Sequence, residues 1–269
     1  MLFQKTNHNG ITSSALNLCK GEGGFRQESF ASLAKLEEAN FWFRARNELI
    51  VWALGKYFPE AVSFLEIGCG TGFVLSGIAK AYPSMALFGG EVYRAGLSIA
   101  EGRVRHAQLM QMDARAIPFE GHFDAVGAFD VLEHIEDDEE VLAQMMRALK
   151  PGGGLLLTVP QHWWLWSPFD TFSCHVRRYS RRGLQAKLSR AGLEILRSTS
   201  FVSLLLPAMF ASRFYRRALE ADHDPLEQLK LVPRLDRLLG AMLRVENQLI
   251  NAGISFPFGG SLFVAARRA

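Results

Sequence analysis

The sequence predicts an α/β fold in which a mostly parallel sheet carries helices on both faces. Three observations predict it. Between residues 61 and 160, short apolar runs typical of strands alternate with amphipathic runs typical of helices, a pattern that builds parallel strands joined by crossover helices. A glycine-rich turn follows the first of these strands. With 269 residues, 49% hydrophobic and 21% charged, the chain has ordinary globular composition.

The same patterns place each element along the chain. Strands are expected at 61–68, 85–91, 107–113, 123–130, 155–160, 192–201 and 261–268. Helices are expected within 28–58 and at 73–82, 94–103, 137–150 and 180–191. Residues 1–27, rich in Gly, Asn, Ser and Thr, are expected to form a loosely packed arm.

The helical stretch before the last strand is interrupted by Pro207, Pro225 and Pro233, which we interpret as breaks. We therefore divide the chain into four parts. They are an N-terminal arm and helix (1–40), the sheet core (41–201), a helical insertion (202–258) and the last core strand (259–269).

Composition excludes several classes of protein. The formal charge is only +3, which does not favour a nucleic-acid partner. Three well-separated cysteines form neither a disulfide framework nor a zinc spacing, so we predict no metal and a cytoplasmic location. The longest apolar stretch, 201–212, contains a proline and falls short of the roughly 20 residues that a bilayer span needs.

The turn EIGCGTG occupies residues 66–72. Gly68, Gly70 and Gly72 allow positive φ and a close approach of backbone to ligand. A dinucleotide fingerprint would need glycine at position 73, where this chain has Phe73. Glu66 would repel a pyrophosphate but suits a ligand with positive charge.

Two more acidic residues end the next two strands. Glu91 can accept hydrogen bonds from both hydroxyls of a ribose, and Asp113 can accept one from an adenine amino group. A pocket of this kind, without a phosphate site, points to S-adenosylmethionine.

The order EIGCGTG, Glu91, MDARAIPF, FDAVGAFDVLEHI and LKPGGGLLLTVP resembles the class I S-adenosylmethionine-dependent methyltransferases, and within them the type 11, ubiquinone-biosynthesis-like group. The resemblance covers roughly residues 40–200 and the last strand. It implies a Rossmann-like, seven-stranded methyltransferase sheet. It also implies the cofactor-binding residues, namely Glu66, Gly68, Cys69, Gly70 and Gly72 for the methionine part, Glu91 for the ribose, Val92, Asp113 and Ala114 for the adenine, and Phe129 below the methionyl group.

Methyl transfer from a sulfonium is an in-line displacement that mainly requires alignment and exclusion of water. A base is needed only when the acceptor is a hydroxyl or a protonated amine. His134, with Asp130 four residues before it, is the best-placed candidate, and His175 with Asp170 is the second. The segment DVLEHI also resembles a metal site proposed in some quinone O-methyltransferases, and alternatively it only leads into the cap of the next helix.

Four segments leave alternatives open. Trp163, Trp164 and Trp166 either wall an apolar substrate or pin their loop to the insertion. The basic run 177–190 either grips an anion or forms a solvated helix face. The aromatic-plus-arginine helix at 39–50 either acts as a lid or only docks on the domain. The insertion is a cap, an interfacial helix at 202–217 or a homodimer surface.

We therefore expect an S-adenosylmethionine-dependent methyltransferase that acts on a small-molecule or lipid-like acceptor, with oxygen favoured over nitrogen or carbon. The alternatives are a methyltransferase-like binding or regulatory module and an NAD-linked oxidoreductase. The expected location is the cytoplasm, at the membrane periphery if the interfacial alternative holds.

Overall fold

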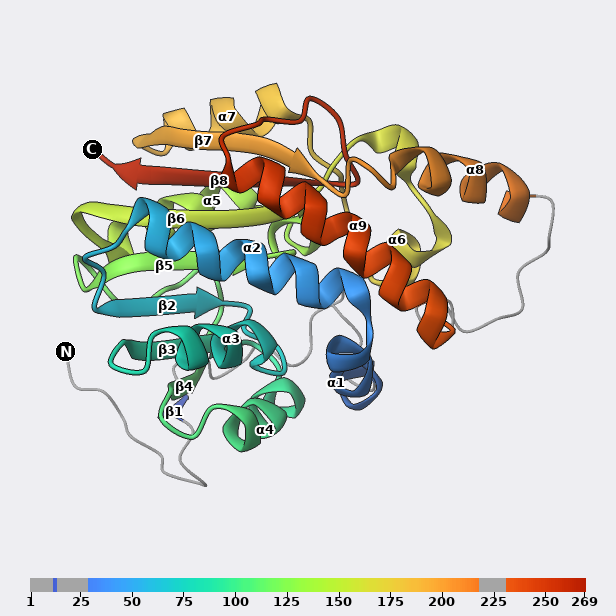
Figure 1. The fold of residues 1–269 in the computed structure, drawn as a ribbon. Helices are drawn as coiled ribbons and strands as arrows, with labels where there is room; N and C mark the ends of the chain where they lie inside the picture. Colours follow the sequence, from blue (N-terminus) through green and yellow to red (C-terminus); the bar gives the residue numbers. More distant parts are fainter. Residues whose placement is uncertain (1–11, 14–28, 218–230) are drawn as a thin grey trace.

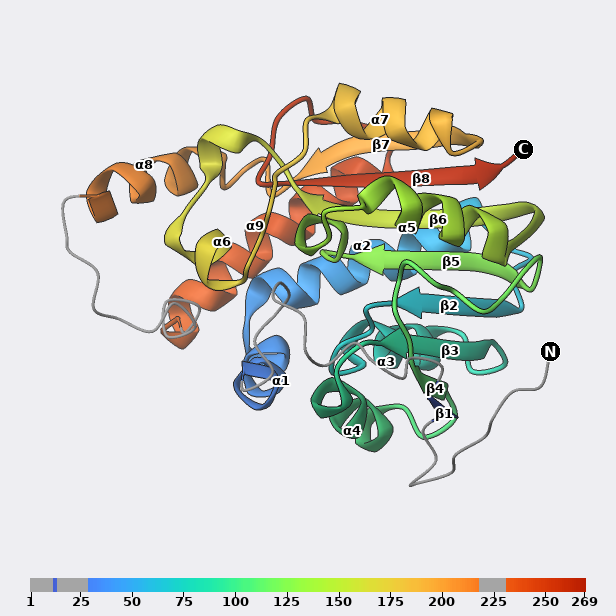
Figure 2. The ribbon, with the colours of Figure 1, turned by 180° about the vertical axis from the view of Figure 1, so that it is seen from behind.

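The computed structural model describes residues 12–13, 29–217 and 231–269, and these form one sheet between two layers of helices (Figures 1 and 2). The strands are β1 (Thr12–Ser13), β2 (Ser63–Ile67), β3 (Ala86–Glu91), β4 (Gln108–Gln111), β5 (Phe123–Phe129), β6 (Leu149–Pro160), β7 (Leu193–Phe201) and β8 (Ser261–Arg268). The α-helices are α1 (Phe30–Ala39), α2 (Phe41–Tyr57), α3 (Phe73–Ala81), α4 (Arg94–Arg103), α5 (Asp138–Ala148), α6 (Pro168–Phe172), α7 (Arg181–Arg190), α8 (Leu206–Arg217) and α9 (Pro233–Asn251). Two short 3₁₀ helices are η3 (Leu132–His134) and η4 (Trp163–Leu165).

The strand order is β1-β4-β3-β2-β5-β6-β8-β7. Strands β1 to β6 pair in parallel, and β8 runs antiparallel between β6 and β7. The seven predicted strands are confirmed. The edge strand β1 is an addition, because Thr12 and Ser13 pair with β4 although the sequence predicts a loosely packed arm there. The other residues of that arm lie outside the described part.

Each face of the sheet is covered by its own helices. Alternating strand residues point to opposite faces, so Phe64 packs in the layer of α2, α3, α4 and α9, while Leu65 packs in the layer of α5 and α7. Both side chains are fully buried. This sandwich confirms the predicted α/β architecture.

Both described helices of the insertion have a proline in their first turn, so the predicted breaks at Pro207 and Pro233 are helix starts. Pro233 is the first residue of α9 and Pro207 the second of α8, because the first turn of a helix needs no N–H donor. Pro225 lies outside the described residues. Helix α9 lies along α2, where the Asn247 side chain donates to the Ala45 carbonyl at 2.9 Å (Figure 1).

The connections place a topological switch point between β2 and β5. From β2 the chain proceeds to β3 and β4 on one side, and it then returns to place β5 on the other side. Ligands of open α/β sheets bind at the carboxyl ends of the strands flanking such a point. Backbone strain gathers at the same edge, since Asp130, His162 and Val202, close to the ends of β5, β6 and β7, have φ of 57°, 63° and 60°.

Candidate functional site

The glycine turn joins β2 to α3 with left-handed backbone at Gly68, Gly70 and Gly72 (φ of 64°, 52° and 74°). A Cβ at Gly68 would lie 2.5 Å from Cγ2 of Val131, so packing alone requires glycine there. A Cβ at Gly70 would meet only Cε1 of Phe30, at an ordinary 3.7 Å. Room for a close ligand approach is therefore found at the middle glycine.

Glu91, at the end of β3, holds this turn in place. Its carboxylate accepts hydrogen bonds from the backbone N–H groups of Gly70 and Tyr93, both at 3.0 Å. Burial raises the pKa of Glu91, against the lowering effect of these bonds. Each carboxylate oxygen keeps a lone pair that can accept a ligand hydroxyl.

Glu66, two residues before the turn, is 3% exposed, and its Oε2 has no hydrogen-bond partner in the protein. Burial raises its pKa well above the usual value, and the Arg46 guanidinium acts in the opposite direction. A buried carboxyl oxygen without a partner is costly. It suits a ligand that brings its own donor or positive charge.

Arg46 of α2 is a site residue for which the sequence offered only the aromatic-plus-arginine pattern. Its guanidinium lies 4.6 Å from the ring centre of Trp42 and donates to the Asp130 carboxylate. The Thr158 hydroxyl donates to the same carboxylate at 3.1 Å. Asp130, a predicted catalytic residue, is therefore engaged by two donors.

Helix α1 lies against the glycine turn through a set of contacts that the sequence did not indicate. The Glu37 carboxylate accepts hydrogen bonds from the Thr71 hydroxyl, at 2.6 Å, and from Arg103. Arg103 also donates to the Ala34 carbonyl at 2.6 Å. The turn is thus tied to α1 and α4 at once.

The predicted adenine-side residues lie at the ends of β3 and β4. The Val92 carbonyl accepts a hydrogen bond from the Gln111 side chain at 2.8 Å. The Asp113 carboxylate pairs with the exposed Arg115, whose Nη2 lies 2.9 Å from Oδ2, and Ala114 is half-buried. An adenine amino group would therefore share Asp113 with this arginine.

Two other predicted residues are buried in the same region. The Cys69 N–H donates to the Gly90 carbonyl at 3.0 Å, which ties the glycine turn to β3. Phe129, at the end of β5, packs on the core layer that contains α2 and α3. Among the predicted cofactor residues, the Glu91 side chain contacts the backbone N–H of Gly70 directly.

The second predicted catalytic pair comes together beyond β5 and β6. The His134 and His175 rings lie 4.7 Å apart, centre to centre, and His175 Nδ1 lies 2.9 Å from Asp170 Oδ1. Against the effect of burial, hydrogen bonds from His175 and Arg178 hold the pKa of Asp170 well below its usual range. Burial, with His175 beside it, lowers the pKa of His134 to about 3.

Glu133 lies beside this histidine pair and is completely buried, with no hydrogen-bond partner for either carboxyl oxygen. Burial, and then the nearby Asp130, raises its pKa well above the usual value. Glu133, His134 and His175 have potential ligand atoms within 4.8 Å of one another, so among the described residues they could hold a cation. The absence of a metal stays a prediction from the sequence.

The tryptophan loop contacts the insertion, and the basic run contacts α5. Trp164 contacts the insertion, with its ring 6.0 Å from that of Phe210, yet stays half exposed. Side chains of the basic run form ion pairs with α5, while Arg182 and Arg190 stay exposed to solvent. Lys187 lies 2.5 Å from Asp138 and Arg190 lies 2.8 Å from Glu139, so α7 is held to α5 by charge.

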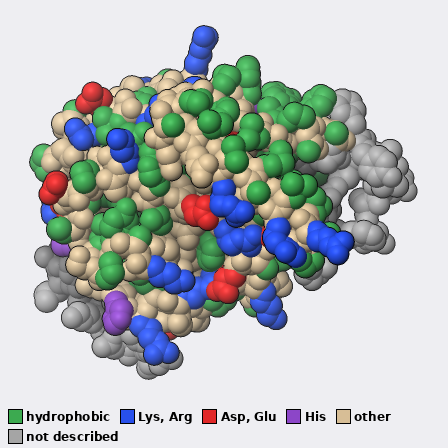
Figure 3. All heavy atoms as spheres, in the orientation of Figure 1, with side chains coloured by type: hydrophobic (Ala, Val, Ile, Leu, Met, Phe, Trp, Pro, Cys, Tyr) green, Lys and Arg blue, Asp and Glu red, His purple; other side chains and the backbone are tan. Residues whose placement is uncertain are grey.

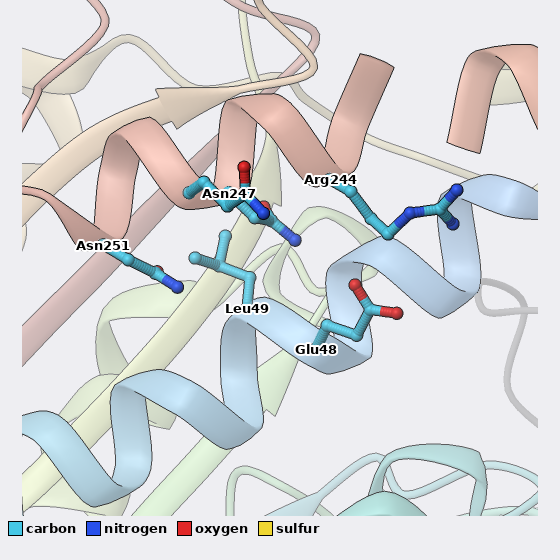
Figure 4. A pocket seen from close by; sticks show the side chains of 6 residues that line it. Glu48, Leu49, Arg244, Asn247 and Asn251 are labelled. Carbon is cyan, nitrogen blue, oxygen red and sulfur yellow. The ribbon is translucent and has the colours of Figure 1, made fainter. Parts of the chain in front are cut away.

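A small pocket between α2 and α9 lies away from this edge of the sheet (Figure 4). Its lining residues are Glu48, Leu49, Arg244, Asn247, Gln248 and Asn251. All six come from the two helices and none from a strand end. We therefore do not assign the acceptor to it.

Comparison with known proteins agrees with this geometry. Residues 36–198 match a family model described as a methyltransferase domain. Relatives include the bifunctional biotin biosynthesis protein BioHC of Teredinibacter turnerae, 25% identical over 190 residues (63% of this chain, 32% of that protein). A probable S-adenosylmethionine-dependent methyltransferase of Mycolicibacterium smegmatis is 26% identical over 167 residues (60% and 62%).

The chain thus spans less than two thirds of the length of both relatives. Among solved structures, phosphoethanolamine N-methyltransferase 2 of Haemonchus contortus, in complex with S-adenosyl-L-methionine, has a TM-score of 0.55 at 18% identity. The alignment covers 82% of this chain and 52% of that one. At this identity the likeness shows the fold alone.

Proposed function

The chain belongs to the methyltransferase-domain family, with an S-adenosylmethionine-dependent domain over residues 36–198, and we propose that the protein transfers the methyl group of this cofactor to an oxygen of a small-molecule or lipid-like acceptor. The observation that carries the cofactor assignment is the buried Glu66 oxygen without a protein partner, next to the glycine turn. A pyrophosphate there would meet an acidic residue. This disfavours the NAD-linked alternative.

Each part of the cofactor has a partner in the glycine turn or in the acidic residues at the strand ends. Glu66 faces the positively charged methionine end, and Gly70 leaves room for the ligand beside the backbone. Glu91, already fixed by two backbone N–H groups, accepts the ribose hydroxyls. Asp113 is the acceptor for the adenine amino group. The bound cofactor supplies a methyl group on a positively charged sulfur, and the protein's task is alignment in a water-poor site.

The histidine pair favours oxygen as the acceptor atom. Because His175 Nδ1 faces Asp170 at 2.9 Å, its Nε2 is the ring nitrogen left to accept a proton. The ionised Asp170 holds the ring in this orientation, and His134 stays neutral beside it. A hydroxyl acceptor requires such a base, whereas a deprotonated amine does not. Asp130 acts in this scheme by holding Arg46.

The test is methyl transfer from radiolabelled S-adenosylmethionine to two probes, an alkyl-substituted phenol and a long-chain primary amine. We expect label on the phenol oxygen, with a rate that falls about 10²-fold in His175→Ala. Transfer to the amine alone would overturn the oxygen assignment. Tight cofactor binding without transfer to any acceptor would instead favour a binding module.

A further inference from the structure

Four large apolar side chains are exposed beyond the carboxyl edge of β6. Trp163, Trp164, Phe210 and Phe258 are 64%, 52%, 48% and 59% exposed. They come from η4, from α8 and from the segment that leads into β8. Folded proteins usually bury such side chains, and a group of them at the surface marks an interaction site. We refer to these four residues as the aromatic surface.

Three residues of the aromatic surface, Trp164, Phe210 and Phe258, are joined through ring contacts, and Trp163 packs on Trp166 with ring centres 4.6 Å apart. The His162 ring stacks on Trp164 at 4.9 Å and lies 5.7 Å from Phe258, and Trp164 lies 6.0 Å from Phe210. Three segments distant in sequence are thus joined through ring contacts. The left-handed backbone at His162 (φ of 63°) directs the chain into η4 at this point.

The rest of the fold holds this surface in place. The Glu246 carboxylate of α9 accepts hydrogen bonds from the backbone N–H groups of Ser203 and Leu204, at 2.9 to 3.0 Å. These residues directly precede α8, so the start of this helix is anchored to the core. Phe210 therefore lies on a helix whose start is fixed to the core.

Exposed positive charge lies on α9. The first turns of α9 expose Arg234 and Arg237. In Figure 3 hydrophobic side chains gather above a row of Lys and Arg side chains that crosses the face formed by α9 and the start of α2. Exposed aromatic rings together with exposed arginines match the interface of a bilayer with anionic headgroups.

The surface also lies at the edge of the sheet that carries the cofactor site. His162 follows the end of β6, and Phe258 precedes β8, whose first residue Ser261 pairs with Pro160. Because β2, β5 and β6 are parallel, their carboxyl ends share one edge. A bilayer resting on the aromatic surface would bring dissolved lipids to this edge.

We propose that the aromatic surface, together with the exposed arginines of α9, docks the protein on the interface of an anionic lipid bilayer, and that the protein takes its acceptor from this bilayer. The proposal rests on the proposed function in that the acceptor is lipid-like. No helix among the described residues meets the length and apolarity of a membrane span. Attachment would therefore be of the interfacial kind, driven by buried aromatic area and by headgroup charge.

The experiment measures sedimentation of the full chain with vesicles of phosphatidylcholine alone or mixed with phosphatidylglycerol. We expect binding to the mixed vesicles that weakens with added salt. The triple variant Trp163→Ser, Phe210→Ser, Phe258→Ser should bind at least about tenfold more weakly. Val62→Ser is the matched control, because Val62 is 65% exposed just before β2, at the opposite edge, and it should bind like the parent.

Three outcomes would overturn the proposal: no binding of the parent to mixed vesicles, equal binding of the triple variant, or self-association of the parent that the triple variant loses. The last would assign the surface to a second copy of the chain. Calorimetric titration with S-adenosylmethionine separates the two proposals, because all variants should bind it equally. Absence of cofactor binding by the parent would contradict the methyltransferase assignment and would not affect the result with vesicles.

Discussion

Arg46 of α2 donates a hydrogen bond through Nη1 to Oδ2 of Asp130, the residue that follows β5. Both side chains are largely buried. The same guanidinium also lowers the pKa of Glu66 and of Glu133, two acids whose pKa burial raises. One cation therefore balances three carboxyl groups on two sides of the switch point.

Removing this cation should be costly for the fold. We expect Arg46→Ala to lower the free energy of unfolding by about 3 kcal/mol, because it leaves Asp130 buried without its charge partner. The double variant with Asp130→Asn should recover part of that loss. Urea unfolding of the four proteins of this cycle measures the coupling, and additivity within about 0.5 kcal/mol would show that the pair is not coupled.

Glu66→Gln should raise the stability of the protein but weaken cofactor binding. Because the pKa of Glu66 is raised by burial, its contribution to stability is present below pH 4.5 and lost as the pH rises above that value. The glutamine variant should therefore be more stable than the parent at pH 8. It should also bind S-adenosylmethionine about 10-fold to 100-fold more weakly, since a charged partner is lost.

Thermal unfolding and calorimetric titration measure these two effects of Glu66→Gln. Glu120→Gln, at an exposed position, is the matched control, and it should change neither quantity. A variant that binds the cofactor as tightly as the parent would remove Glu66 from the binding site.

Glu91→Ala should weaken cofactor binding by about 1–3 kcal/mol. Two effects combine, because the variant loses the acceptor for the ribose hydroxyls and also frees Gly70 N–H. They can be distinguished by comparing S-adenosylhomocysteine with its 2′-deoxy analogue. The parent should prefer the ribose compound, and the variant should lose that preference. An unchanged preference would limit Glu91 to holding the turn.

The sequence predicted the elements that depend on local pattern. The seven strands and the turn at Gly68, Gly70 and Gly72 follow from spacing and composition, and so does the position of Glu91 at a strand end. The pairing of Arg46 with Asp130 joins positions 84 residues apart, and no local pattern specifies it. The ion pairs of the basic run could not be predicted for the same reason, because the acids that pair with α7 lie on α5.

The acid stability of the protein should depend on His134. Its pKa falls from 6.5 to about 3 on folding, so its contribution is fully present above pH 6.5 and lost as the pH drops toward 3. The loss within this window is about 1.4 kcal/mol per pH unit. We expect His134→Asn to unfold at temperatures that depend less on pH between 7 and 5. Parallel curves for variant and parent would mean that His134 is not held neutral.

The turnover rate should depend on Asp170. Hydrogen bonds from His175 and Arg178 hold the pKa of Asp170 well below its usual range, so it is ionised wherever the enzyme is assayed. The carboxylate lies 2.9 Å from Nδ1 of His175 and so fixes which ring nitrogen faces the acceptor. In Asp170→Asn we therefore expect kcat to fall about 10²-fold.

A matched control is needed because Asp170 also organises its loop, accepting hydrogen bonds from Ser167 at 2.7 and 2.8 Å. Asp124→Asn removes another ion-paired carboxylate, bound to Lys150 at 2.6 Å at the opposite edge of the sheet. It should lower the melting temperature and leave kcat unchanged. A purely structural Asp170 would behave in the same way, so an unchanged kcat in Asp170→Asn would mean that Asp170 only organises its loop and does not orient a catalytic His175.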